Sequence, residues 1–303
     1  MALRSLSSIA VATVVLTGCR LLFAQAEFPD LRTIPPDVSV PQAKAGAAAA
    51  GRRTFVRLEG QPAEICYVLS LPDGWDPTRR WPLFVELPGN GGYRDANGDR
   101  CSGLPEDCAM GHGLTEGRDW IWVCLPFLNG DGSAIARQWW GDAPEHDPAA
   151  TLRFWRAALG DVQRRFLASP ETVVLAGFSR GSIACNALGL HDDDTAAMWT
   201  AFLPCSHYDG VRSWPFPGSD RAAAERRLRR LGSRPQLIMG EGRQTEATRD
   251  YLASTGIAMD QCTLLSTGFR NHSDRWALRP SAARSQARAW LQSLEKNEST
   301  CPR

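Results

Sequence analysis

A serine held between two glycines is the residue of this sequence best suited to covalent chemistry. The run Gly177-Phe178-Ser179-Arg180-Gly181 follows the apolar segment 172–176 and precedes a stretch of small residues that reaches Leu190. In such a run a strand turns sharply into a helix, and the glycines let the two elements approach closely. The serine hydroxyl then stands at the helix N-terminus, where main-chain N–H groups favour a developing negative charge. The pattern predicts Ser179 as the nucleophile of an acyl-transfer reaction.

A serine nucleophile needs a general base, and one histidine has a suitable position. The five histidines are His112, His146, His191, His207 and His272. Only His272 follows the last strand predicted in the chain and precedes the C-terminal helix. An imidazole at that point of the chain can take the hydroxyl proton. The sequence therefore predicts His272 as the base.

The elements that must position these residues alternate between short apolar strands and helices. Strands are predicted over 54–58, 65–71, 83–87, 120–125, 172–177, 200–203, 236–239 and 263–267. Several are nearly all apolar, as parallel strands covered on both faces must be. Helices are predicted from Asp147-Pro148 to Phe166 and over 222–231, 246–254 and 282–294. This order predicts an α/β fold, with a mostly parallel eight-stranded sheet and helices on both faces.

Residues 54–294 resemble the α/β-hydrolases, in particular a group of exported bacterial esterases, feruloyl esterases and prolyl-oligopeptidase-like proteins. The stretch Tyr67–Gly92 is similar to that group's second and third strands. In the group, a His-Gly-Gly-type turn after the third strand supplies one oxyanion N–H, and the residue after the nucleophile supplies another. The turn here reads Pro88-Gly89-Asn90-Gly91-Gly92, without the histidine. The donors that the resemblance implies are Arg180 and either Asn90 or Gly91.

The resemblance leaves the acidic partner of the histidine open. The group most often carries Asp about three residues beyond the glycine that ends the seventh strand, and Arg243 occupies that place here. Glu241 comes slightly earlier in the same turn. Asp209 follows the sixth strand, from which the acid originates in some members of the superfamily, and Glu246 is a more distant alternative. Asp209 and Glu241 therefore remain the two predicted candidates for the group that orients the imidazole.

Aromatic residues gather near the edge of the sheet where the site is predicted. Trp139 and Trp140 lie between the fourth strand and the next helix, Tyr208 follows the sixth strand, and Trp276 follows the eighth. Exposed rings beside a catalytic site can stack on a sugar or an aromatic group. We predict these four side chains to bind substrate, with packing in the core as the alternative for each.

The N-terminal residues have the composition of a targeting segment. Arg4 precedes an apolar stretch that ends at Ala24-Gln25-Ala26, which predicts removal of residues 1–26 as a signal peptide. Leu16-Thr17-Gly18-Cys19 also resembles a bacterial lipobox, in which Cys19 would carry a lipid anchor. An oxidising compartment agrees with the eight further cysteines, among which Cys101 and Cys108 are predicted to form a disulfide.

The remaining organisation favours one enzyme domain without a cofactor. Residues 27–52 are predicted as a linker or N-terminal arm, 53–296 as the hydrolase domain and 297–303 as a tail. The net charge of +1 gives no reason to expect nucleic acid as a partner. We predict a secreted or periplasmic serine esterase for a small-molecule or polymer ester, with no metal ion and with the membrane reached only through a lipid on Cys19. A prolyl-oligopeptidase-like peptidase and a non-catalytic binding protein are the alternatives.

Overall fold

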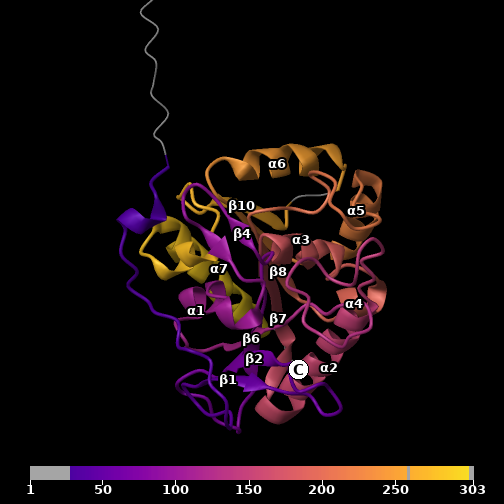
Figure 1. Ribbon diagram of the computed structural model, residues 1–303. Helices are drawn as coiled ribbons and strands as arrows, with labels where there is room; N and C mark the ends of the chain where they lie inside the picture. Colours follow the sequence, from indigo (N-terminus) through magenta and orange to yellow (C-terminus); the bar gives the residue numbers. More distant parts are fainter. Residues whose placement is uncertain (1–27, 258–259, 300–303) are drawn as a thin grey trace, which may run out of the picture.

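A twisted eight-stranded sheet forms the centre of the protein (Figure 1). The computed structural model describes residues 28–257 and 260–299. The strands stand in the order β1 (Arg53–Val56), β2 (Tyr67–Ser70), β6 (Ile121–Cys124), β3 (Trp81–Leu87), β7 (Ala168–Phe178), β8 (Ala201–Cys205), β9 (Gln236–Gly240) and β10 (Cys262–Ser266). Strand β2 is antiparallel to both its neighbours, and the pairings from β6 to β10 are parallel. The predicted mostly parallel eight-stranded sheet is confirmed.

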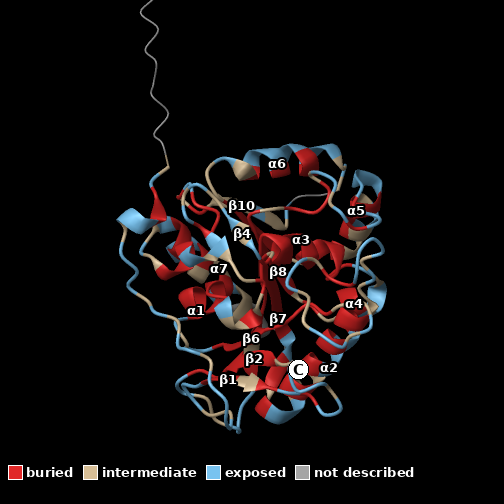
Figure 2. Cartoon of the chain, in the orientation of Figure 1, coloured by how far each residue is buried: buried red, intermediate tan, exposed pale blue. Residues whose placement is uncertain are grey.

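Helices cover both faces of this sheet, as predicted (Figure 1). They are α1 (Met110–Thr115), α2 (Ala149–Phe166), α3 (Arg180–Ala187), α4 (Asp193–Ala196), α5 (Arg221–Leu228), α6 (Gln244–Ser254) and α7 (Ala282–Ser299). Apolar residues of α1 and α7 pack on one face, and those of α2, α3, α5 and α6 pack on the other. Figure 2 shows the central strands buried between the two helical layers, which explains why their sequences are mostly apolar.

The short helices α1 and α4 and a small hairpin were not expected from the sequence. The hairpin consists of β4 (Tyr93–Arg94) and β5 (Arg100–Cys101), which pair antiparallel between β3 and α1. Strands of two residues carry no hydrophobic period that a sequence pattern could reveal. This insertion lies directly after the turn that follows β3, so it belongs to the surroundings of the predicted site.

The segment from Phe28 to Arg52 packs along the hydrolase domain. Leu31 is buried, and its N–H donates to Oδ1 of Asn271 at 2.7 Å. Near the other end, Lys44 forms an isolated bridge with Thr54 at the start of β1. The segment therefore reaches the loop that carries His272, although 240 residues separate Leu31 from Asn271 along the chain.

The predicted disulfide between Cys101 and Cys108 is not formed. Within the described residues the cysteines Cys66, Cys101, Cys108, Cys124, Cys185, Cys205 and Cys262 are all free thiols. Cys101 packs against Gly89 in the turn after β3, whereas the buried Cys108 lies with Cys124 and Glu86 beneath α1. The two side chains therefore have different neighbours, despite lying only seven positions apart in the sequence.

Some predictions lie outside the described residues. These are the signal peptide over 1–26, the lipobox at Cys19 and the last residues of the tail, which include Cys301. In the part of the chain that the structure covers, no helix is both long and apolar enough to cross a membrane.

Candidate active site

Ser179 lies at the sharp turn between β7 and α3. Its backbone has φ 54° and ψ −111°, a conformation that a residue with a side chain rarely adopts. The Ser179 N–H donates to the carbonyl oxygen of Cys205 at 3.0 Å, which ties the turn to the end of β8. A Cβ atom on Gly177 would overlap the backbone of Gly181, so the turn requires glycine at that position. The strained turn holds the serine hydroxyl at the first turn of α3.

His272 connects this hydroxyl to a carboxylate. Its Nε2 lies 3.0 Å from Oγ of Ser179, and its Nδ1 lies 2.6 Å from Oε1 of Glu241. Burial would raise the pKa of Glu241, but the hydrogen bond and the charge of His272 outweigh it and hold that pKa below its usual value. The carboxylate is therefore charged near neutral pH, and it favours the imidazole tautomer whose Nε2 can accept the serine proton.

Asp209, the other candidate for the acid, lies elsewhere. Its two carboxylate oxygens accept hydrogen bonds from Nε and Nη2 of Arg227, at 2.8–3.0 Å. Burial raises the pKa of Asp209 to about 6, against the opposing effect of Arg227. The prediction of Asp209 as the acid is wrong, because the Arg227 side chain from α5 binds that carboxylate instead of the imidazole of His272. The more distant alternative, Glu246, lies beside Arg243, with which it forms an ion pair of 3.8 Å.

Ser206, which the sequence pattern does not single out, also contacts the acid. Its hydroxyl donates to Oε1 of Glu241 at 3.0 Å and lies 2.9 Å from Nδ1 of His272. Ser206 has a positive φ of 93°, directly after β8. A polar residue at the carboxyl end of a parallel strand is the signal that could have found it.

A network behind His272 fixes the loop that carries it. Asn271 is buried, and its amide donates to both carboxylate oxygens of Asp99 at 3.2 Å while accepting the N–H of Leu31. The rings of Tyr93 and Phe178 each pack against the imidazole, with centroids 4.7 Å from it. The hairpin and the N-terminal segment thus help to position the imidazole.

The turn after β3 offers a narrower choice of oxyanion donors than predicted. The N–H of Gly91 donates to the carbonyl oxygen of Arg137 at 2.7 Å. This N–H is therefore not free to bind an oxyanion, and the prediction of Gly91 as an oxyanion donor is wrong. Oδ1 of Asn90 accepts the N–H of Trp139 at 2.9 Å, which fixes the turn. Arg180 is the first residue of α3, where main-chain N–H groups lack partners within the helix. The N–H groups of Asn90 and Arg180 therefore remain as candidates.

The Arg180 side chain has a structural role that the sequence did not reveal. It is 1% exposed and donates to the carbonyl oxygens of Ala136, Trp139 and Gly103. Burial lowers the pKa of this guanidinium to about 9. The side chain holds together the two loops that flank the turn after β3.

Three of the four aromatic residues predicted to bind substrate are core residues. Trp140 is 1% exposed and packs on Phe127 and Phe216. The buried Tyr208 donates to Gln236 at 2.7 Å, and the indole N–H of the buried Trp276 donates to Sγ of Cys205. These side chains are fully covered, so the predictions for Trp140, Tyr208 and Trp276 are wrong.

Trp139 is the half-buried member of that group. Its ring packs on Trp214, with centroids 5.7 Å apart, and the Trp214 ring in turn packs on His207 at 5.1 Å. The His207 ring lies 5.1 Å from the ring of His272. Trp139, Trp214 and His207 thus form a partly exposed aromatic row that leads to the base.

The burial of His207 predicts a pH dependence of stability. Burial lowers the pKa of His207 from 6.5 to about 4, and the charge of His272 acts in the same direction. The folded protein therefore keeps this ring neutral at pH values where the unfolded chain protonates it. The free energy of unfolding should fall as the pH drops from about 6.5 to about 4, because protons bind preferentially to the unfolded chain there.

We expect His207→Gln to reduce this acid sensitivity by about 2 kcal/mol, after allowing for the partial exposure of the ring. Urea unfolding of both proteins at about pH 7 and about pH 4 measures the difference. The exposed His191→Gln serves as the control. It removes only a surface ion pair with Asp192, at 3.0 Å, which contributes little to stability, so its pH dependence should stay close to that of the wild type. The same pH dependence in the wild type and in His207→Gln would contradict the assignment.

The sheet order and the strained serine turn define the α/β-hydrolase fold. No protein-family model and no curated protein matches the sequence. Among solved structures, esterase 2 of Thermogutta terrifontis, phosphorylated by paraoxon, is 14% identical, with a TM-score of 0.53 over 83% of this chain and 96% of the esterase. The acylaminoacyl peptidase of Pyrococcus horikoshii is 12% identical, with a TM-score of 0.53 over 84% of this chain and 43% of the peptidase.

Several similar structures are much longer than this chain. The chain spans 35% of the length of a putative dipeptidyl aminopeptidase IV, 60% of a thermostable esterase and 37% of an oligopeptidase B. At such low identities the similarity concerns the fold. The predicted resemblance of residues 54–294 to the α/β-hydrolases is therefore confirmed for the fold.

Proposed function

We propose that the protein is a serine hydrolase that cleaves carboxylic esters. The observation that carries this proposal is the continuous chain of contacts from Ser179 Oγ through His272 to Glu241, at 3.0 and 2.6 Å. The nucleophile, the base and the orienting acid of a hydrolytic triad need these contacts and this order.

The geometry supports a two-step reaction. Ser179 attacks the ester carbonyl while Nε2 of His272 takes the hydroxyl proton, and Glu241 stabilises the imidazolium through Nδ1. The main-chain N–H groups of Arg180 and Asn90 stabilise the oxyanion. The imidazolium then protonates the leaving alcohol, and water activated by His272 releases the acid from Ser179.

We also propose that the protein acts outside the cytoplasm. This rests on the apolar segment that ends at Ala24-Gln25-Ala26 and on the lipobox-like sequence before Cys19. Mass spectrometry of the mature N-terminus tests it. A chain that begins at about residue 27 supports soluble export, a lipidated Cys19 supports an anchor, and an uncleaved N-terminus overturns the proposal.

A fluorophosphonate probe and two chromogenic substrates test the reaction. We expect the probe to label Ser179 and the protein to hydrolyse p-nitrophenyl acetate, because an activated serine attacks both. Ser179→Ala should lose the label and lower kcat by about 10⁴-fold or more, as removal of a triad serine does in other hydrolases. The exposed Ser133→Ala is the control and should retain both.

Two other results of these experiments would contradict the proposal in different ways. Equal, weak labelling of wild type and Ser179→Ala would overturn the enzymatic proposal and favour a binding protein with this fold. Faster turnover of a peptide p-nitroanilide than of the ester would replace the esterase with a peptidase. This second outcome keeps the triad but changes the substrate class.

A further inference from the structure

A cavity of about 840 Å³ lies beside the nucleophile turn. Its wall includes Gly89 and Phe178. A Cβ on Gly89 would lie 3.3 Å from Cβ of Ser179, so this part of the wall touches the nucleophile. Tyr93, which packs against the ring of His272, is also part of the wall. A substrate held at Ser179 can therefore extend into this cavity.

The wall of this cavity is rich in arginine. Its charged residues are Arg32, Arg94, Arg100, Arg137, Arg275 and Arg279 together with Asp99, Asp107 and Asp274. The whole chain is nearly neutral, with 34 basic and 33 acidic residues. The excess of positive charge is therefore a local property of this cavity, which we call the arginine pocket.

Some of these charged groups are engaged by the protein itself. Arg32 forms an ion pair with Asp30, and Nε of Arg279 donates to the carbonyl oxygen of Leu31. The carboxylate of Asp99 accepts the amide of Asn271 at 3.2 Å, and burial raises its pKa. These groups position loops around the pocket.

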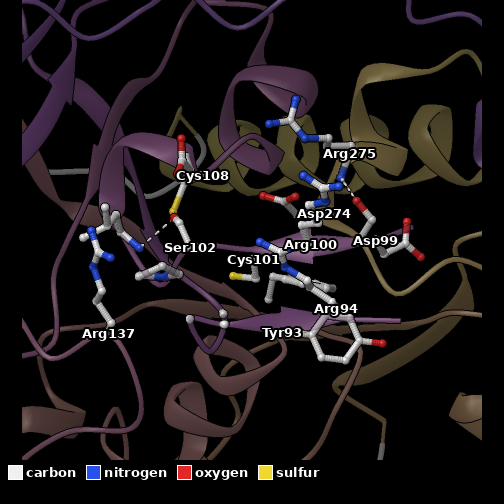
Figure 3. A pocket seen from close by; sticks show the side chains of 18 of the residues that line it. Tyr93, Arg94, Asp99, Arg100, Cys101, Ser102, Cys108, Arg137, Asp274 and Arg275 are labelled. Atoms are coloured by element: carbon white, nitrogen blue, oxygen red, sulfur yellow. Dashed lines mark hydrogen bonds between the residues drawn. The ribbon is translucent and has the colours of Figure 1, made fainter. Parts of the chain in front are cut away.

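Four arginines of the pocket have exposed side chains that the protein itself does not bind. Within residues 28–257 and 260–299, no hydrogen bond or ion pair holds the guanidinium groups of Arg94, Arg100, Arg137 and Arg275. Figure 3 shows Arg94 and Arg100 on the hairpin that crosses the pocket, with Arg137 and Arg275 at opposite sides. All four side chains line the same cavity.

The hairpin itself brings two like charges together. In the register of β4 and β5, Arg94 stands directly opposite Arg100. Directly opposed side chains have Cβ atoms only about 5 Å apart, and like charges there destabilise the pairing. An anion between the two guanidinium groups would remove this repulsion. Such a pair in a hairpin of two-residue strands thus points to a ligand.

We propose that the arginine pocket binds an oxyanion group of the ester that Ser179 cleaves. The inference rests on the proposed function and narrows it to anionic esters. Carboxylate and phosphate groups share the required chemistry, because the planar guanidinium donates paired hydrogen bonds to either. The exposed position of the arginines also attracts an anionic substrate from solution.

Matched esters test the proposal. On the alcohol side, 4-acetoxybenzoate and 4-acetoxyphenyl phosphate are compared with the neutral methyl 4-acetoxybenzoate. On the acyl side, p-nitrophenyl glutarate is compared with p-nitrophenyl valerate. We expect kcat/KM for at least one anionic ester to exceed that of its neutral match by about tenfold or more. Added salt should reduce this ratio, since it screens exposed charges. No preference for any anionic ester would overturn the proposal.

Variants then locate the preference. The double variant Arg94→Gln/Arg100→Gln should lower the anionic-to-neutral ratio to about one, chiefly by raising KM for the anionic ester. Arg137→Gln should lower the ratio in part. Arg229→Gln, an exposed arginine outside the pocket, is the control and should retain it. A ratio that survives in the double variant and in Arg137→Gln would overturn the assignment.

Failure of the reaction can be separated from failure of the pocket. If Ser179 neither reacts with the fluorophosphonate nor hydrolyses the neutral esters, the proposed function fails. Calorimetry with Ser179→Ala and 4-acetoxybenzoate then tests the pocket alone. If 4-acetoxybenzoate binds, and substitution of Arg94 and Arg100 abolishes that binding, the pocket is an anion site even though the protein does not hydrolyse esters. The absence of binding overturns both proposals.

Discussion

Glu241→Gln should lower kcat for ester hydrolysis by about 10³–10⁴-fold, while KM changes little. The amide is nearly isosteric, so the loop and the contact with His272 can persist. Its NH₂ group can donate to Nδ1 of His272, however, and would favour the imidazole tautomer that carries the proton on Nε2. That tautomer cannot accept the proton of Ser179, and the corresponding change in a hydrolytic triad costs about 10⁴ in kcat. Steady-state kinetics with p-nitrophenyl acetate measures the effect.

Asp209→Asn is the matched control for this prediction. Asp209 also follows a strand of the sheet, but its carboxylate binds Arg227, at 2.8 Å. We expect kcat to stay within about threefold of the wild type. The free energy of unfolding should fall by about 3 kcal/mol, because the change leaves Arg227 without its buried charged partner. Equal losses of kcat in the two variants would show that the geometry around His272 does not identify the acid.

The order of the elements explains which parts of the site the sequence predicts well. Ser179 and His272 each follow a buried strand in a parallel sheet, where carboxyl ends meet at one edge. The strand patterns and the chain order therefore predict that the two side chains lie close together. Glu241 and Asp209 satisfy the same condition, so the pattern alone cannot separate them. Which of the two carboxylates orients His272 depends on Arg227, which binds Asp209 although it lies 18 positions away in the sequence.

Side-chain direction in loops is a second limit of the sequence. Trp139 and Trp140 are adjacent, yet Trp140 is buried in the core and Trp139 is half-buried beside Trp214. Trp139 has a positive φ of 52°, so the side chains of these two residues do not follow the regular alternation of directions found in a strand. The hairpin that carries Arg94 and Arg100 is equally irregular. Its importance becomes visible only when the cross-strand register brings the two arginines together.

Gly181→Ala should destabilise the protein by about 3 kcal/mol, the second large effect that the structure predicts. A Cβ atom at this position would overlap the carbonyl oxygen of Leu87 and lie 2.8 Å from its carbonyl carbon. Backbone atoms of a central strand cannot rotate away as a flexible side chain can, so α3 must move relative to β3. Because Ser179 and the N–H of Arg180 belong to the same turn, the displacement should lower kcat as well as stability.

Thermal and urea unfolding, combined with hydrolysis of p-nitrophenyl acetate at a temperature where the variant is folded, measure both effects. Gly74→Ala is the control, since a Cβ there would meet no atom within 4 Å and its φ is not positive. That variant should match the wild type in stability and in kcat. If Gly181→Ala instead behaves like Gly74→Ala, the close approach of α3 to β3 is not what holds Ser179 in its strained conformation. The turn would then need another source of rigidity to keep the hydroxyl within reach of His272.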